Sequence, residues 1–169
     1  MDTLARKLRE CCRGRVLLLG LGNDLFGDDG FGVRLAEQVA GAVRDSSVLQ
    51  AVVAGASPER FVSERGSWDN VIFADAVEMG QRPGSATILD ASAIRARFPQ
   101  VSTHKLSLGV LARYVESQGR ARAWLLGVQP QTVAPGTPLS PPVASAVRAL
   151  ASAVTAQAGQ SSSSRSAGK

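Results

Sequence analysis

Two aspartates and one histidine are spread along the chain in positions that suit metal binding or acid–base chemistry. Asp29 follows a glycine-rich stretch, Asp75 follows the apolar run 71–74, and His104 is the only histidine in the 169 residues. Two carboxylates and an imidazole suit zinc, nickel or a similar ion, and three protein ligands leave positions open for water or a substrate group. Either carboxylate could instead serve as a general base.

Each of these residues also has a structural explanation. Asp29 precedes an expected helix and suits its N-cap, whereas a lone histidine such as His104 is more often a satisfied structural residue than a ligand. Asp28 is expected to bond amides of its own loop, and Asp24 to be a solvated turn residue. Asp75 is harder to explain in this way, because an acid after four apolar residues needs a partner. The hypothesis of a site therefore depends on the set.

Other sites fail on spacing. Gly20 begins a dinucleotide fingerprint, but Leu25 occupies the position of its third glycine, and no Gly-Lys-Ser/Thr follows for a phosphate loop. A calcium loop beginning at Asp24 would need a glycine where Asp29 stands. No Gly-x-Ser-x-Gly elbow is present for a serine nucleophile.

The elements that must position the set follow from the apolar pattern. Short uninterrupted apolar runs are typical of strands buried on both faces, and apolar residues every three or four positions are typical of helices. Strands are expected over 16–19, 48–54, 71–74, 86–89 and 123–128. Helices are expected over 1–13, 31–43, 58–62, 91–98, 143–154 and around 108–115, the last of these capped by Ser102 or Thr103.

This alternation predicts an α/β fold, a single domain with a mostly parallel sheet of about five strands covered by helices on both sides. Ligands in such folds bind beyond the carboxyl ends of the strands, where the three residues are expected to meet. The domain is expected to span 15–157. An amphipathic extension precedes it over 1–14, and a disordered tail follows over 158–169, composed of Ser, Gly, Ala, one Gln and two basic residues.

The composition argues against several functional classes. The net charge is +5, but the basic residues are scattered and aromatic residues make up only 5% of the chain, so nucleic-acid binding is not expected. No run approaches the ~18 apolar residues of a membrane span, and the amino terminus lacks a signal-peptide pattern. Cys11 and Cys12 are adjacent and therefore poorly placed for a disulfide. A cytoplasmic monomer is expected.

Four motifs, in order, resemble those of the nickel–iron hydrogenase maturation proteases, endopeptidases that trim the carboxyl-terminal tail of a hydrogenase large subunit. They are Gly20-Leu21-Gly22-Asn23 with Gly27-Asp28-Asp29-Gly30-Phe31-Gly32, Ala74-Asp75-Ala76-Val77 with Gly80 and Pro83-Gly84, Ser102-Thr103-His104 with Leu106 and Leu108, and Gly127-Val128-Gln129-Pro130. The resemblance covers about residues 16–147 and is nearest to the formate-hydrogenlyase (hydrogenase 3) type. It implies a twisted sheet sandwiched between helices and three metal ligands, Asp29, Asp75 and His104.

The resemblance also implies a partner, a hydrogenase large-subunit precursor whose inserted nickel serves as the recognition handle. Nickel is expected to arrive with the substrate rather than to be permanently bound, and zinc or cadmium to occupy the site in vitro. The expected substrate-binding residues are Gly22, Asn23, Asp28, Gly55 and Pro130. The mechanism stays open: the metal polarises the carbonyl or activates a water, or it positions the substrate while Asp29 or Asp75 acts as general base.

Two other functions are compatible with the same residues. A nickel-dependent checkpoint or chaperone would hold the precursor without cutting it. An unrelated α/β hydrolase acting on small molecules would keep its activity when Asp75 and His104 are both replaced. The first alternative shares the proposed site, whereas the second does not.

Overall fold

The centre of the molecule is a five-stranded sheet in the order β2-β1-β3-β5-β4. The structure is a computed structural model that describes residues 2–62, 67–97, 107–119 and 121–166. The strands are β1 (Val16–Leu21), β2 (Leu49–Gly55), β3 (Asn70–Ala76), β4 (Ala86–Asp90) and β5 (Arg122–Val128). All run parallel except β4, which pairs antiparallel with β5 at one edge. The predicted mostly parallel sheet of about five strands is therefore confirmed.

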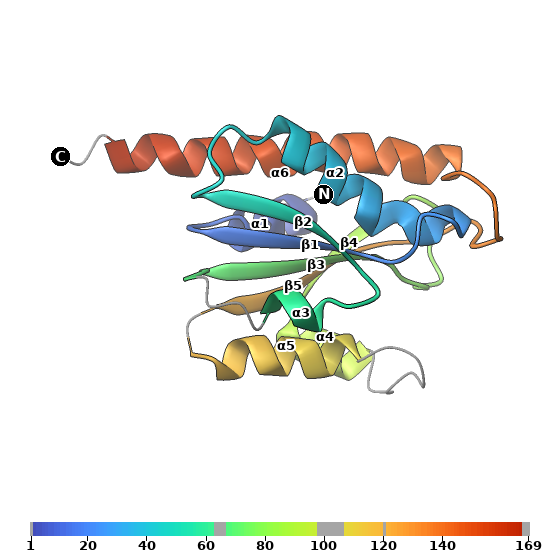
Figure 1. The fold of residues 1–169 in the computed structure, drawn as a ribbon, viewed down its shortest axis with the longest axis horizontal. Helices are drawn as coiled ribbons and strands as arrows, with labels where there is room; N and C mark the ends of the chain where they lie inside the picture. Colours follow the sequence, from blue (N-terminus) through green and yellow to red (C-terminus); the bar gives the residue numbers. More distant parts are fainter. Residues whose placement is uncertain (1, 63–66, 98–106, 120, 167–169) are drawn as a thin grey trace.

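Helices cover both faces of this sheet (Figure 1). They are α1 (Asp2–Cys11), the 3₁₀ turn η1 (Gly27–Gly30), α2 (Phe31–Ala42), α3 (Glu59–Val62), α4 (Ala91–Arg97), α5 (Leu108–Ser117) and α6 (Pro141–Ser166). One apolar core joins the sheet to α1, α2 and α6, and a second joins the opposite face to α4 and α5. Within the residues described, no helix has the length and apolar character needed to cross a bilayer.

The central strands are apolar throughout because both of their faces are buried. In β1, Leu18 packs in the core beneath α2 and α6, while its neighbour Leu17 packs in the core beneath α4 and α5. Ile72 and Phe73 divide between the same two cores in β3. Successive side chains of a strand point to opposite faces, so a strand covered on both sides cannot alternate apolar and polar residues.

The amino-terminal helix α1 is part of the domain rather than a separate extension. Leu8 and Cys11 are buried in the core shared with α2 and α6, and Lys7 Nζ donates a hydrogen bond to Ile88 O of β4 at 2.9 Å. Cys11 and Cys12 are free and buried. The adjacent Cys12 and burial raise the pKa of the Cys11 thiol, which makes it a poor nucleophile.

Two expected helix boundaries are wrong. The N-cap of α5 is Ser107, whose side chain accepts a hydrogen bond from Val110 N at 3.1 Å. The expected caps, Ser102 and Thr103, lie outside the described residues. The final helix continues to Ser166, and Ala158 is buried, so a disordered tail does not begin at residue 158. Extending a helix that is already nucleated fixes one residue for each hydrogen bond gained, which favours continuation into a weak sequence.

Helix α2 approaches the carboxyl ends of the strands at backbone contact. A Cβ atom added to Gly32 would overlap Ala74 O of β3 and would lie 2.5 Å from Leu21 O of β1. A Cβ added to Gly20 would overlap Gly32 O. The absence of a side chain at these two glycines lets α2 sit directly on the strand ends.

We expect Gly32→Ala to destabilise the fold by about 1 to 3 kcal/mol, because the new methyl group meets backbone atoms that cannot move aside locally. Urea unfolding monitored by circular dichroism measures this change. Gly41→Ala is the matched control: Gly41 lies in the same helix with nothing within 4 Å of an added Cβ. It should stabilise the protein by up to about 1 kcal/mol. Equal stability of the two variants would contradict the close packing.

Candidate functional site

The loop after β1 turns back on itself at Gly22. Gly22 has φ of +100°, a conformation that favours glycine, and its amide donates to Gly55 O at the end of β2 at 3.1 Å. The next amide, Asn23 N, donates to Asp29 Oδ2 at 2.8 Å. The Asn23 side chain in turn accepts from Leu25 N at 3.0 Å. The ends of β1 and β2 and Asp29 of η1 therefore meet at one place.

Asp29 is held across this loop rather than at the start of α2. The N-cap of α2 is Gly30, which has no side chain to bond, so the expected helix-capping role of Asp29 is not observed. Its one hydrogen bond within the described part of the chain engages Oδ2 and fixes the carboxylate on the side of Asn23. No described residue bonds the other oxygen, Oδ1, which is therefore available to a ligand.

Asp75 lies inside β3, one residue before the strand ends, whereas the sequence placed it just beyond the strand. It pairs with Gly127 of β5 and is only 9% exposed. Placing a carboxylate among buried strand ends is costly unless the group is paired or hydrogen-bonded. The contact between Gly32 and Ala74 O sets the start of α2 against the last residues of β3. Asp29 lies three residues before Gly32, and Asp75 directly follows Ala74 in β3. The contact between Gly32 and Ala74 therefore brings their two segments together.

The third predicted ligand, His104, lies outside the described residues. Its approach to Asp29 and Asp75 stays a prediction. In the segments that the structure does describe, no group of three His, Cys, Asp or Glu side chains is placed to hold a metal ion. This result does not cover the proposed trio, because Asp29 and Asp75 are described but His104 is not.

Asp28 has a different environment from its neighbour, because it is completely buried. Its Oδ2 accepts hydrogen bonds from Gln131 N at 2.7 Å, Thr132 N at 3.1 Å and the Ser140 hydroxyl at 2.8 Å, while Oδ1 accepts from Ser140 N at 2.7 Å. A structural role was expected, but with amides of its own loop, and that choice of partners is wrong. An enclosed carboxylate also cannot contact substrate, so the expected substrate-binding role of Asp28 is wrong too.

The electrostatics of Asp28 agree with this role. Burial by itself raises the pKa of the carboxyl, but hydrogen bonds from the amides of Ser140, Gln131 and Thr132 and from the Ser140 hydroxyl outweigh it. The pKa therefore lies below its ordinary value. Asp28 is a charged clamp that fastens η1 to the proline-rich loop 129–140.

Gln129 belongs to the last of the four sequence motifs, but the motif by itself assigned it no role of its own. It is buried at the end of β5, where its side-chain oxygen accepts from Met79 N at 2.7 Å and Gln81 N at 3.2 Å. Its amide nitrogen donates to Glu78 at 2.8 Å and to Pro130 O at 3.2 Å. Gln129 thus shapes the segment that follows Asp75. A polar side chain directly after an apolar strand was the available signal, the same one that identified Asp75.

Three apolar side chains are exposed on the two loops that Asp28 fastens together. Leu25 is 67% exposed, Val133 53% and Phe26 40%. The loops also bond directly, through Gly136 N to Leu25 O at 2.8 Å. An apolar surface next to a candidate site is typical of a place where a protein partner docks.

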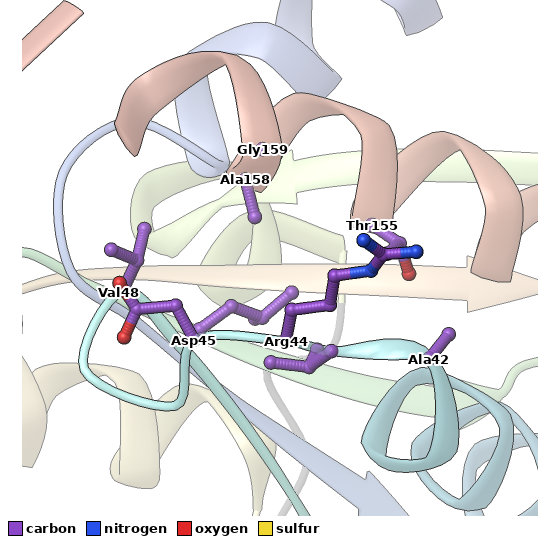
Figure 2. Close-up of a pocket in the computed structure, with 9 residues that line it drawn as sticks. Ala42, Arg44, Asp45, Val48, Thr155, Ala158 and Gly159 are labelled. Carbon is purple, nitrogen blue, oxygen red and sulfur yellow. The ribbon is translucent and has the colours of Figure 1, made fainter. Parts of the chain in front are cut away.

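A pocket of about 310 Å³ lies elsewhere, between the turn from α2 to β2 and helix α6 (Figure 2). Val48, Leu49, Ala158 and Arg44 are among its lining residues, and the Arg44 side chain extends toward Thr155. The pocket is at the amino end of β2, whereas Gly55 and the candidate site are at its carboxyl end. It is therefore separate from the site.

Comparisons with known proteins agree with this architecture. The profile of the family described as "Hydrogenase maturation protease" matches residues 33–157. The chain is 30% identical over 136 residues to the hydrogenase 3 maturation protease of Escherichia coli K12, covering 79% of this chain and 85% of that protein. It is 32% identical over 165 residues to the hydrogenase expression/formation protein HupD of Bradyrhizobium diazoefficiens, covering 90% and 84%.

Solved structures give the same result. The [NiFe] hydrogenase maturation protease HycI of Thermococcus kodakarensis superposes with a TM-score of 0.81 at 28% identity, over 90% of this chain and 99% of that one. The hydrogenase maturating endopeptidase HybD of Escherichia coli superposes with a TM-score of 0.73 at 26% identity, over 87% and 93%. The similarity therefore extends over almost the whole fold.

Replacing the clamp tests its structural role. We expect Asp28→Asn to lower the free energy of unfolding at pH 7 by about 2 to 3 kcal/mol, because its neutral amide meets four donors with one acceptor oxygen. The control is Asp24→Asn, in the same loop. Asp24 forms an exposed ion pair with Arg34 at 3.0 Å, and such pairs contribute little. Equal urea midpoints for the two variants would argue against the clamp.

The lowered pKa of Asp28 also predicts how the stability of the protein changes with pH. A carboxyl whose pKa is lowered by folding stabilises the protein fully above its unfolded pKa of about 3.9, and that contribution is lost as the pH falls through the lower folded value. The stability difference between the wild type and Asp28→Asn should therefore be constant from about pH 7 to pH 5 and shrink below about pH 4. Urea titrations at each pH measure it.

Proposed function

The chain belongs to the hydrogenase maturation protease family, and from that premise we propose that it cuts the carboxyl-terminal tail from a nickel–iron hydrogenase large-subunit precursor. The precursor is recognised after nickel insertion, through the bound metal. Asp29, Asp75 and His104 are the ligands that the chain contributes. The family is one of endopeptidases, so peptide-bond hydrolysis is its activity.

The observation that carries the assignment of these ligands is the contact at Gly32. It sets the start of α2 on the end of β3 and so brings the segments of Asp29 and Asp75 to the same edge of the sheet. Two carboxylates and an imidazole form a mixed ligand set that suits nickel, and three ligands leave positions that a metal bound in the precursor can fill with its own ligands. Nickel is thus part of the substrate. Zinc or cadmium would occupy the same ligands in vitro.

The surroundings suit an extended protein substrate. Gly22 and Asn23 present backbone close to Asp29, Gly55 ends the neighbouring strand, and Pro130 lies on the clamped loop after β5. The exposed Leu25, Phe26 and Val133 lie on the same loops and would contact the body of the precursor. We assign these residues to substrate binding.

Cleavage requires an activated water as well as an oriented peptide. Nickel in the docked precursor would supply a Lewis acid. The chain itself orients the precursor, and Asp29 or Asp75 accepts a proton from the water that attacks the scissile carbonyl. The free, buried cysteines are compatible with a reducing compartment, and we propose that the enzyme acts as a cytoplasmic monomer.

The wild type should shorten a nickel-loaded large-subunit precursor by one carboxyl-terminal peptide, as measured by intact-protein mass spectrometry. Asp29→Asn, Asp75→Asn and His104→Ala should each slow cleavage at least about 100-fold, because each removes a ligand or a base. Asp24→Asn, five residues before Asp29 in the same exposed loop, is the control and should cut at the wild-type rate. An unchanged precursor mass with the wild type would refute the assignment of substrate.

Metal dependence separates the enzyme from the checkpoint or chaperone considered above. Precursor prepared without nickel should keep its full mass and should not co-elute with the enzyme, because the shared ligands are missing. Restoring nickel should restore both binding and cleavage. Nickel-dependent co-elution without any loss of mass would instead support the checkpoint.

A further inference from the structure

Strand β2 forms one edge of the sheet, and its outward backbone groups can be identified. Val16 N donates to Val48 O at 2.8 Å, so the polar backbone groups of residue 48 point toward β1. Backbone groups alternate in direction along a strand, so residues 50 and 52 also face β1. The alternation holds as far as Val53. Beyond it the register shifts, and Gly55 O rather than Ala54 O bonds the chain at the end of β1. Ala51 and Val53 direct their N–H and C=O groups away from the sheet. Leu49 N, which bonds Asp45 O at 3.3 Å, has the same outward direction.

Among the residues that the structure describes, this edge lacks the features that normally protect an edge strand from pairing. The sequence of β2, Leu-Gln-Ala-Val-Val-Ala-Gly, contains neither a charged residue nor a proline. Val53, in this strand, is an apolar residue that is 44% exposed. The opposite edge, β4, is protected, because Lys7 of α1 donates a hydrogen bond to Ile88 O. An apolar, unprotected edge is a risk that natural proteins avoid unless it serves a purpose.

The direction of β2 indicates that purpose. The strand begins beside the pocket of Figure 2 and ends at Gly55, whose carbonyl accepts from Gly22 N one residue before the amide that holds Asp29. A peptide lying along the outer edge of β2 would therefore be led to the candidate site. The substrate of an endopeptidase is a chain with free backbone donors and acceptors, which is what this edge can bind without regard to sequence.

We propose that the outer edge of β2 binds the cleavable tail segment of the precursor as an added β-strand, with hydrogen bonds to the backbone of Ala51 and Val53. The proposal rests on the proposed function and specifies how its substrate is held. Backbone pairing orients the tail and leaves the metal ligands to select the nickel-loaded precursor.

Val53→Pro removes one outward N–H, a change that edge strands tolerate at such positions. With nickel-loaded precursor, we expect KM to rise about threefold to tenfold, the loss of one net hydrogen bond, while kcat stays near the wild-type value. Val53→Ala keeps the N–H and should raise KM less. Thermal unfolding of each variant shows whether its fold is retained.

A pair of lysine substitutions tests the edge without removing a backbone donor. Val53→Lys places a charge on the edge and should raise KM at least as much as Val53→Pro. Val110→Lys is the matched control, because Val110 is 45% exposed on α5, on the other side of the sheet, and it should cleave as the wild type does. If Val53→Pro unfolds, this pair decides the question.

The outcomes separate this inference from the proposed function. If the wild type does not shorten the precursor, the proposed function fails. If the wild type cuts and Val53→Lys has the same KM as Val110→Lys, strand addition is wrong while the function stands. A wild-type dimer in size-exclusion chromatography that Val53→Lys dissociates, with KM unchanged, would assign the edge to a second copy of this chain and also overturn the proposal.

Discussion

The contact between Gly32 and the backbone of β3 is the constraint on which the site depends. No residue with a side chain fits at this position without moving α2 away from the strand ends. Gly20 imposes the same requirement from β1, because an added Cβ there would overlap Gly32 O. The start of α2 is therefore fixed to the sheet by backbone packing, and the loop before it, which carries Asp29, is fixed with it. Asp75 is placed by the strand that α2 contacts.

Asp28 and Asp29 are adjacent in the sequence but have opposite uses. Asp28 points inward, where four donors from the proline-rich loop surround its carboxylate. Asp29 stays half-buried, and among the described residues its carboxylate accepts one bond, from Asn23 N. The Asp28 carboxylate holds η1 against the loop 129–140, and this fixes the backbone that carries Asp29. If Asp29 binds the metal as proposed, this division is physically reasonable, because a ligand must retain free lone pairs while its support has none to spare.

Several features that are uncommon on a purely structural surface lie at the carboxyl edge of the sheet or lead to it. They are a nearly buried carboxylate at Asp75, exposed apolar side chains at Leu25, Phe26 and Val133, and an unprotected strand edge in β2. Each makes the folded state less favourable or the surface more adhesive. Asp75 and the exposed apolar side chains lie at the end of the sheet opposite to the pocket beside α6, and the outer edge of β2 runs from that pocket toward them. This arrangement suits an endopeptidase that acts on a protein substrate.

The sequence alone determined the strands, their burial on both faces, the mostly parallel sheet and the two acids at its carboxyl edge, because apolar runs and their periods are local properties of the chain. Only the tertiary structure decided the partners of Asp28, the role of Gln129, the integration of α1, and the choice of β2 as the open edge. The Asp28 bonds join residues more than 100 positions apart, and no local pattern specifies which loop will supply the donors. Long-range pairing is set by how elements pack, and packing is known only once they are placed together.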